Sequence, residues 1–159
     1  MATYTQPVVF ELSGLSYGID ITRVSSIEND VTYTPVPNSA PYIMGIMNLR
    51  GSVIPVFDLK KRFNIQNGVQ STSMIIVNLK KTIIGIAVDA VKEINNIPAQ
   101  NIVDMPSLIK KQDTTYFDRV ASVNGRLIVL LDIDVLIPEE DQEAYNKMTE
   151  EISSENGIQ

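Results

Sequence analysis

The chain has 159 residues, of which 44% are hydrophobic and 20% are charged, a composition typical of a soluble globular protein of one domain or two small subdomains. Its formal net charge of -6 argues against broad nucleic-acid binding, which requires clustered Lys and Arg side chains. The sequence contains no apolar run of the roughly 18 residues that a membrane helix needs, and the N-terminus lacks the features of a secretory signal.

The first predicted elements are two short strands. Val8, Phe10 and Leu12 recur with the two-residue period of a half-buried strand. After a turn at residues 13–16 the chain continues into a second strand that contains Gly18. A glycine inside a strand usually marks a bulge or a sharp bend, so we expect one at Gly18.

Further along, the sequence predicts a hairpin, a short helix and a C-terminal helix. Arg50-Gly51 is a hairpin turn because glycine accepts a positive φ. Residues 58–64 follow a strand and indicate one or two helical turns. Residues 66–73 have low hydrophobicity and link the two halves of the chain. The acidic segment 138–159 is expected to form a helix over 139–151 and to end in a tail that is dispensable from Glu143 onward.

Two blocks of the sequence occur twice and in the same order. The block "VVFELSGLSYGIDITRVSSI" aligns without a gap with "IIVNLKKTIIGIAVDAVKEI", which places Gly18 on Gly85. The block "RGSVIPVFDL" aligns with "NGRLIVLLDI", which places Arg50 on Asn124. A repeat of this kind indicates a duplicated unit and an all-β fold of two small barrels of about five strands each. Within a domain at 1–137 we expect the first barrel mainly at 8–65 and the second mainly at 72–137, with exchange of strands possible.

The residues that most enzymes use are missing. The chain has no histidine and no cysteine, which excludes Ser-His-Asp, Cys-His and zinc sites and is consistent with a reducing cytoplasm. Asp58 and Asp132 occupy equivalent repeat positions after matching strands. A helix N-cap is the simplest explanation of both, and a paired-acid or metal site is the alternative. We therefore predict no enzyme activity, no cofactor and no metal.

The series "YGIDITRV", "IMGIMNLRGSVIPVFDL" and "IIGIAVDAV" resembles the CheW family of chemotaxis adaptors over residues 8–137. The resemblance implies two packed SH3-like five-stranded β-barrels with short helices. It also implies a non-catalytic scaffold that couples the cytoplasmic tips of chemoreceptors to the regulatory domain of the histidine kinase CheA. Such a protein is cytoplasmic, is recruited to membrane-associated receptor arrays, and does not itself insert into the membrane.

The resemblance also implies two sets of contact residues. The receptor-binding candidates are Val24, Gly45, Asn48, Leu49 and Arg50. The kinase-binding candidates are Ser73, Ile75 and Val91. Family members often carry a carboxylate at the position of Ser26 that can pair with the arginine, and Glu28 lies on the same face and is a possible substitute.

Each candidate also has a purely structural interpretation. Val24 and Val91 occupy the same slot of the repeat, which favours packing in the core, and Gly45 could serve only the backbone. Arg50 differs because its repeat partner is Asn124, so the fold does not require an arginine in this turn. That asymmetry favours a functional role for Arg50.

Three other functions stay open. With no kinase region before the domain and no receiver region after it in this sequence, we expect a free adaptor, but the chain could be the CheW-like half of a CheV-type protein. A general SH3-like peptide-binding module is disfavoured because aromatic residues are only 6% and tryptophan is absent. An acid-dependent hydrolase would require two carboxylates that face one cleft.

Overall fold

The computed structural model describes residues 4–37, 40–65, 70–106, 116–137 and 139–155. The strands are β1 (Tyr4–Thr5), β2 (Pro7–Leu12), β3 (Leu15–Asp20), β4 (Val24–Glu28), β5 (Ile43–Leu49), β6 (Ser52–Asp58), β7 (Ser73–Asn78), β8 (Ile83–Val88), β9 (Ala90–Ile94), β10 (Ile97–Pro98), β11 (Ile102–Asp104), β12 (Phe117–Val123) and β13 (Arg126–Leu131). The helices are η1 (Ile21–Arg23), α1 (Leu59–Arg62), η2 (Ala99–Asn101), η4 (Ile133–Val135) and α2 (Glu139–Glu155).

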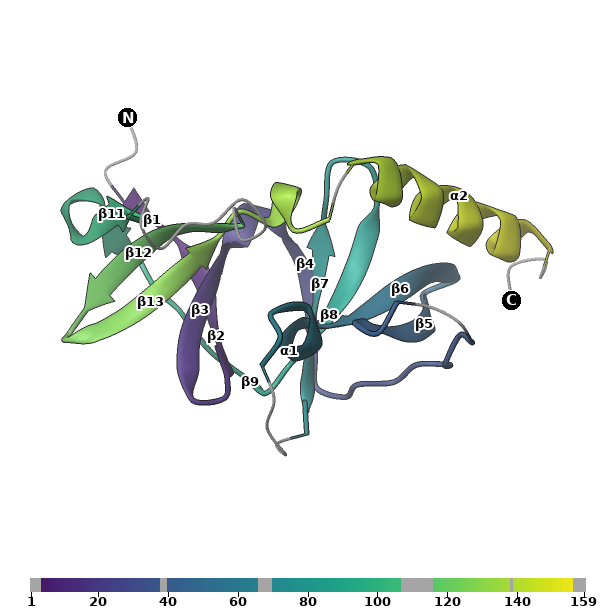
Figure 1. Ribbon diagram of the computed structural model, residues 1–159, viewed down its shortest axis with the longest axis horizontal. Helices are drawn as coiled ribbons and strands as arrows, with labels where there is room; N and C mark the ends of the chain where they lie inside the picture. The colour runs from purple at the N-terminus through teal and green to yellow at the C-terminus, as the bar shows by residue number, and fades with distance from the viewer. Residues whose placement is uncertain (1–3, 38–39, 66–69, 107–115, 138, 156–159) are drawn as a thin grey trace.

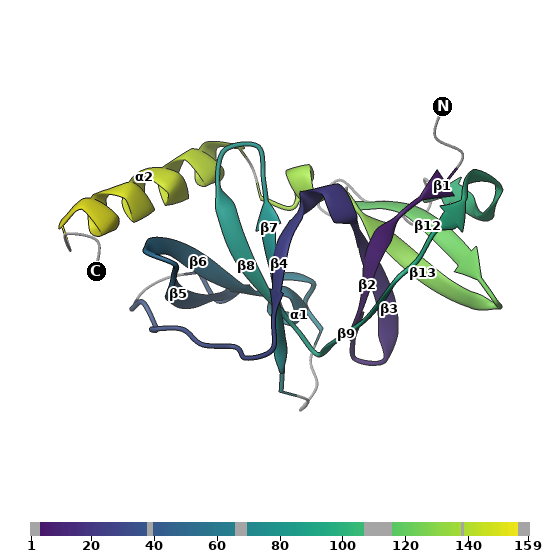
Figure 2. The ribbon, with the colours of Figure 1, turned by 180° about the vertical axis from the view of Figure 1, so that it is seen from behind.

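Two main sheets lie side by side, and α2 extends from the end of the molecule that holds β5 and β6 (Figure 1 and, from behind, Figure 2). The six-stranded sheet has the order β11-β12-β13-β3-β2-β9, and the five-stranded sheet has the order β4-β7-β8-β6-β5. Most pairs are antiparallel, but β13 runs parallel to β3 and β6 runs parallel to β8. The predicted mainly-β fold of two packed five-stranded units is therefore confirmed, with one extra strand, β11, on the first sheet.

The two halves of the chain exchange strands extensively. The hairpin β2–β3 joins β9, β12 and β13 from the second half, while β4, β5 and β6 join the hairpin β7–β8. Each sheet thus takes strands from both halves, and neither sheet corresponds to residues 8–65 or 72–137. The exchange that the sequence left open is the organising feature of the fold.

The duplicated pattern sets the strand register on both sides. Gly18 of β3 pairs with Leu130 of β13, and Gly85 of β8 pairs with Val56 of β6. Leu130 and Val56 are equivalent residues of the repeat, each five positions after its turn glycine. The two sheets therefore have the same internal register, residue for residue, at their parallel pairs.

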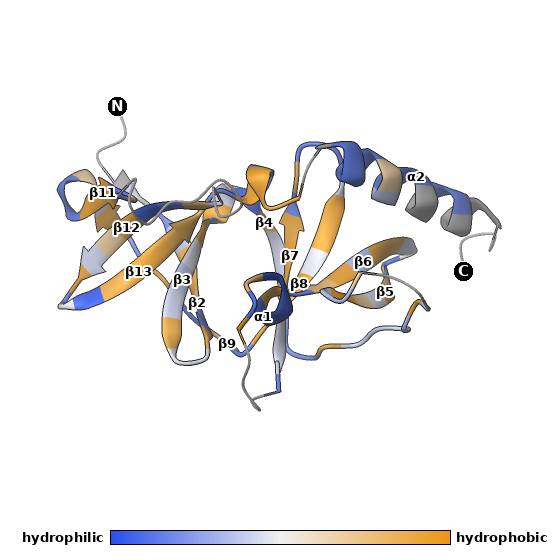
Figure 3. Ribbon diagram, viewed as in Figure 1, coloured by the Kyte–Doolittle hydropathy of each residue, from blue (hydrophilic) through white to orange (hydrophobic). Residues whose placement is uncertain are grey.

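Hydrophobic residues are concentrated in the strands (Figure 3), and those of the described part of the chain form three apolar clusters. The central cluster lies between the two sheets and includes Phe10, Leu12, Ile19, Phe57, Ile75 and Ile86. A second cluster belongs to the six-stranded sheet and includes Val9, Ile128 and Leu130. A third belongs to the five-stranded sheet and includes Ile54, Met74 and Ile76. Successive residues of one strand thus enter different cores, so the strand predicted as half-buried at Val8–Leu12 is buried on both faces.

No bulge occurs at Gly18, which is one of the two alternatives expected there, or at its repeat counterpart Gly85. Strand pairing runs through both positions without a shift. A Cβ atom at Gly18 would lie 2.9 Å from Cδ2 of Leu130, and one at Gly85 would lie 2.8 Å from Sδ of Met74. At both glycines a neighbouring side chain packs directly against the backbone and would have to shift to admit a Cβ atom.

The C-terminal helix packs on the protein, which contradicts the expectation of a dispensable segment. α2 lies along β6, and the ring of Tyr145 meets the ring of Phe57 edge-on at 5.7 Å. Gln142 is buried, accepts a hydrogen bond from the Lys81 amide over 2.9 Å, and donates one to the Ile137 carbonyl over 2.8 Å. The acidic residues of this segment led to the prediction of a dispensable tail, and the contact of Tyr145 with Phe57 was not predicted.

Candidate protein-interaction site

The turn between β5 and β6 carries the strongest of the predicted contact residues. Arg50 and Gly51 have φ values of 52° and 90°, the geometry of a two-residue hairpin turn with a positive φ at both positions. The Asn48 side-chain oxygen accepts a hydrogen bond from the Gly51 amide over 2.8 Å. Asn48 therefore stabilises the turn itself, which gives it a structural role that the sequence did not reveal.

Arg50 has no comparable structural role. Its side chain is exposed and, within the described part of the chain, makes no hydrogen bond or ion pair. Glu28, the proposed intramolecular partner, instead accepts a hydrogen bond from the Ser26 hydroxyl over 3.0 Å. A non-glycine residue at positive φ costs roughly 1–2 kcal/mol, and asparagine tolerates this region better. The equivalent turn has Asn124 at φ 51°, so Arg50 occupies a position where the backbone favours asparagine.

The other receptor-binding candidates lie deeper in the protein. Leu49 is half-buried and packs on the core of the five-stranded sheet, and Val24 packs on the central core from the opposite edge strand, β4. Gly45 is buried, because a Cβ atom there would lie 2.1 Å from the Thr34 carbonyl oxygen. Gly45 thus allows Thr34, in the connection from β4 to β5, to pair with Ile46 of β5 at close range, and it offers no side chain to a partner.

Only two of the three kinase-binding candidates have side chains that are partly exposed. Ile75 is 0% exposed in the central core, so its side chain is not available to a partner and this assignment is corrected. Ser73, at the start of β7, and Val91, in β9, are each partly exposed. They lie in different sheets, on the two sides of the passage from β8 to β9.

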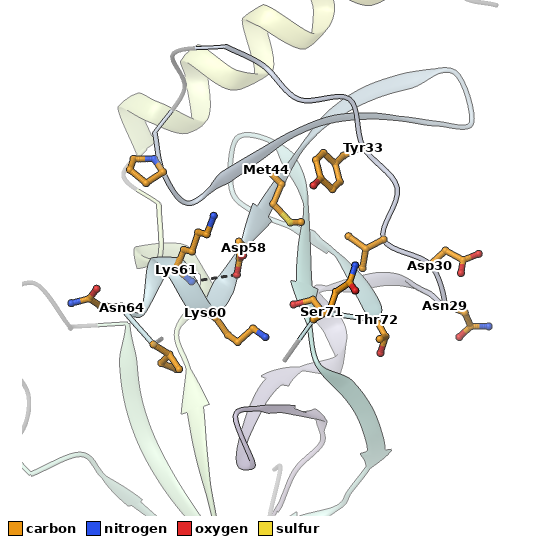
Figure 4. Close-up of a pocket in the computed structure, with 14 residues that line it drawn as sticks. Asn29, Asp30, Tyr33, Met44, Asp58, Lys60, Lys61, Asn64, Ser71 and Thr72 are labelled. Carbon is orange, nitrogen blue, oxygen red and sulfur yellow. Dashed lines mark hydrogen bonds between the residues drawn. The ribbon is translucent and has the colours of Figure 1, made fainter. Parts of the chain in front are cut away.

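A groove of about 890 Å³ lies between α1 and the connection that leads from β4 to β5 (Figure 4). Tyr33 and Met44 line one side of the groove, Lys61 of α1 lines the other, and Asp58 lies between Met44 and Lys61. None of the predicted contact residues lines this groove.

The structure removes the reason for an acid-dependent hydrolase. The Asp58 side chain accepts from the Lys61 amide as the N-cap of α1, and the Asp132 side chain accepts from the Asp134 amide as the N-cap of η4. The two carboxylates follow strands of different sheets, and each has the capping role predicted for it. Among the described residues there is no group of three or more acidic side chains placed to hold a metal ion.

Comparisons with known proteins agree with this architecture. The CheW-like domain family model matches residues 6–141. The chemotaxis protein CheW of Thermotoga maritima is 33% identical over 131 residues, which cover 82% of this chain and 85% of that protein. The chemotaxis protein CheW of Klebsiella aerogenes is 31% identical over 137 residues, which cover 84% of this chain and 82% of that protein.

The fold itself matches a solved scaffold protein. The crystal structure of the scaffolding protein TtCheW from Thermoanaerobacter tengcongensis superposes with a TM-score of 0.76 at 36% identity and covers 84% of this chain and 92% of that one. In the described part of the chain no helix is long and apolar enough to span a membrane. With the family model, the relatives and the fold in agreement, the chain belongs to the CheW family of chemotaxis scaffold proteins.

Proposed function

We propose that this protein is a non-catalytic adaptor of the cytoplasm that couples the tips of chemoreceptors to the regulatory domain of the kinase CheA. The family membership supports the coupling role. The lack of histidine and cysteine, together with the capping roles of Asp58 and Asp132, supports a role without catalysis.

The observation that carries the receptor contact is the state of Arg50. The Arg50 guanidinium is exposed at the tip of a hairpin, has no partner among the described residues, and sits at a backbone conformation that favours asparagine. Strain that serves no internal contact is commonly retained for function. A guanidinium offers five donors in a planar fork, which suits the carboxylates and free carbonyls of a helical receptor tip. Arg50 is the contact residue, with Asn48 and Leu49 as positioning residues.

The kinase contact belongs to a separate surface near the passage from β8 to β9. Ser73 and Val91 remain its candidates because both are partly exposed there. Ser73 lies in β7, which β8 separates from β6, and Val91 lies in the other sheet. Neither residue belongs to the β5–β6 hairpin, which is compatible with simultaneous binding of two partners, as a coupling protein requires.

The substitution Arg50→Asn tests the receptor contact. The equivalent turn already uses asparagine, so the variant should melt at the same temperature or slightly higher, because up to about 1 kcal/mol of backbone strain is removed. Loss of a desolvated arginine contact should reduce affinity for a receptor-tip fragment about tenfold or more, and should leave CheA binding unchanged. Titration calorimetry with each partner measures both.

The double variant R50N/N124R provides a control of identical composition, because it moves the arginine to the equivalent turn of the other sheet. Receptor affinity should stay as low as in R50N. If affinity returns, or if R50N binds the receptor fragment normally, Arg50 is not the contact residue.

A further inference from the structure

Two ion pairs lie at the two places where the chain passes from one sheet to the other. The first passage is η1, between β3 and β4, and the second contains Asp89, between β8 and β9. Arg23 of η1 holds the Asp134 carboxylate through both terminal nitrogens, with Nη1 donating to Oδ2 over 2.7 Å. Lys60 of α1 places its Nζ 2.6 Å from Oδ1 of Asp89. Both pairs therefore join the halves of the chain at a crossover.

Both pairs are anchored by further backbone contacts. The side chains of Lys60 and Asp89 are 7% and 10% exposed, and Asp89 also accepts a hydrogen bond from the Ser13 amide over 2.8 Å. Arg23 donates from Nε to the Asn78 carbonyl over 3.0 Å. Ion pairs with this degree of burial and fixed geometry differ from loose surface pairs, which contribute little.

The two pairs are related by the duplication. Lys60 and Asp134 occupy the same repeat position, two residues after the equivalent caps Asp58 and Asp132. In the alignment of residues 8–27 with residues 75–94, Asp89 falls on the residue directly before Arg23. The same two locations of the repeated fold are thus joined by an ion pair on each side of the molecule.

The polarity of the two pairs is reversed. Both cations, Arg23 and Lys60, belong to the first half of the chain, and both anions, Asp89 and Asp134, belong to the second half. We propose that this separation of charge selects the pairing of each half with the other and prevents pairing of like halves from two copies of the chain.

The geometry explains why such selection is needed. The strand pairings of β2 with β9 and of β7 with β4 have equivalent registers, with a bulge at the same point. The backbone pattern would therefore also allow the first half of one copy to pair with the first half of another. That arrangement would bring Lys60 against Arg23. Pairing of two second halves would bring Asp134 against Asp89, so both wrong pairings place like charges together at a buried crossover.

Exchange of one ion pair removes the selection while it keeps the native contact. In R23E/D134R the native pair is still of opposite charge, but like halves become complementary. The carboxylate introduced at position 23 would meet Lys60, and the guanidinium introduced at position 134 would meet Asp89. Neutral R23Q/D134N is intermediate. After refolding from denaturant at a series of protein concentrations, the dimer-to-monomer ratio should rise in the order wild type, R23Q/D134N, R23E/D134R. We expect the ratio for R23E/D134R to exceed that for the wild type by about tenfold or more, as measured by size-exclusion chromatography with light scattering.

Exchange of both pairs provides the matched control. In R23E/D134R/K60E/D89K the first half carries both anions and the second half both cations, so the wild-type ratio should return. If the exchange at the buried Lys60 prevents folding, the order of the first three proteins still decides. Equal ratios for the wild type and R23E/D134R, both with a native circular dichroism spectrum, would overturn the proposal. The proposal is independent of the receptor and kinase contacts.

Discussion

The two sheets share one backbone plan and differ in what has been added to it. In the five-stranded sheet, α2 packs along β6, and Tyr145 covers Phe57. The equivalent strand of the six-stranded sheet, β13, carries no such helix in the described part of the chain, and Leu127 is 65% exposed. The hairpin tips also differ, with Arg50 on one and Asn124 on the other. The two copies thus share their strand register, and they differ at the hairpin tips and in the helix that packs on only one of them.

The largest expected effect comes from a glycine that only one sheet needs. The backbone of Thr34 lies directly against Gly45, whereas the repeat counterpart of Gly45 is Arg119, which carries a full side chain. Gly45→Ala forces the connection from β4 to β5 away from β5 and should cost about 3 kcal/mol or more. At this chain size that lowers the melting temperature by roughly 6–12 °C in differential scanning calorimetry. An unchanged melting temperature for Gly45→Ala would mean that the β4–β5 connection adjusts freely.

Removal of α2 should make the two sheets more alike and the protein less stable. Deletion of residues 143–159 exposes Phe57 and should cost about 2 kcal/mol, mainly from the lost burial and ring contact of Tyr145. Tyr145→Ala in the full chain should reproduce most of the loss, which urea unfolding measures. Deletion with unchanged stability would restore the view of α2 as a dispensable segment.

Substitution of the equivalent glycines Gly18 and Gly85 should have a smaller effect on stability, and this effect should differ between the two sheets. An added methyl group at Gly18 meets Leu130 and also the Cβ atom of Pro7 at 3.0 Å, while one at Gly85 meets only side-chain atoms of Met74 and Ile76. The Met74 side chain is flexible and can move. Gly18→Ala should therefore cost about 1–3 kcal/mol and Gly85→Ala less, by chemical denaturation of both variants side by side. Equal losses would show that Met74 is held as rigidly as Pro7.

The smallest effect is the acid response of the crossover pair that is more exposed. The hydrogen bonds from Arg23 hold the pKa of Asp134 below its usual value of 3.8. A lowered pKa stabilises the folded state above the unfolded-state value, and this stabilisation disappears as the pH falls through the folded-state value. The free energy of unfolding of the wild type should therefore decline below about pH 4, relative to that of Asp134→Asn, which lacks this carboxyl group. If the free energies of unfolding of the two proteins change in parallel with pH, Arg23 does not lower the pKa of Asp134.

Tyr145, which packs on the five-stranded sheet, also makes the stability of the folded state depend on pH in alkaline solution. Burial, with smaller contributions from Tyr42 and Asp141, raises the pKa of Tyr145 to about 12. A raised pKa means that the folded state is favoured up to the usual value of 10.0 and loses that advantage as the pH rises toward 12.

The candidate site could be predicted only in part. The Arg50-Gly51 turn and the caps at Asp58 and Asp132 were predictable because each depends on a few adjacent residues. The burial of Ile75 and Gly45 was not, because an apolar residue or a glycine in a strand has the same local pattern whether it faces a core, a crossing backbone or a partner.

By itself the sequence determined the duplication, the strand and turn pattern, the capping residues and the family, because periodicity, turn chemistry and repeats are carried by neighbouring residues. Only the tertiary structure decided which strands pair: β3 with β13 and β6 with β8, across the two halves. Equivalent units have equivalent edges, so local pattern cannot choose between pairing within a half and pairing between halves. That choice is made by contacts between distant residues, such as the Arg23–Asp134 pair, which exist only after the chain has folded.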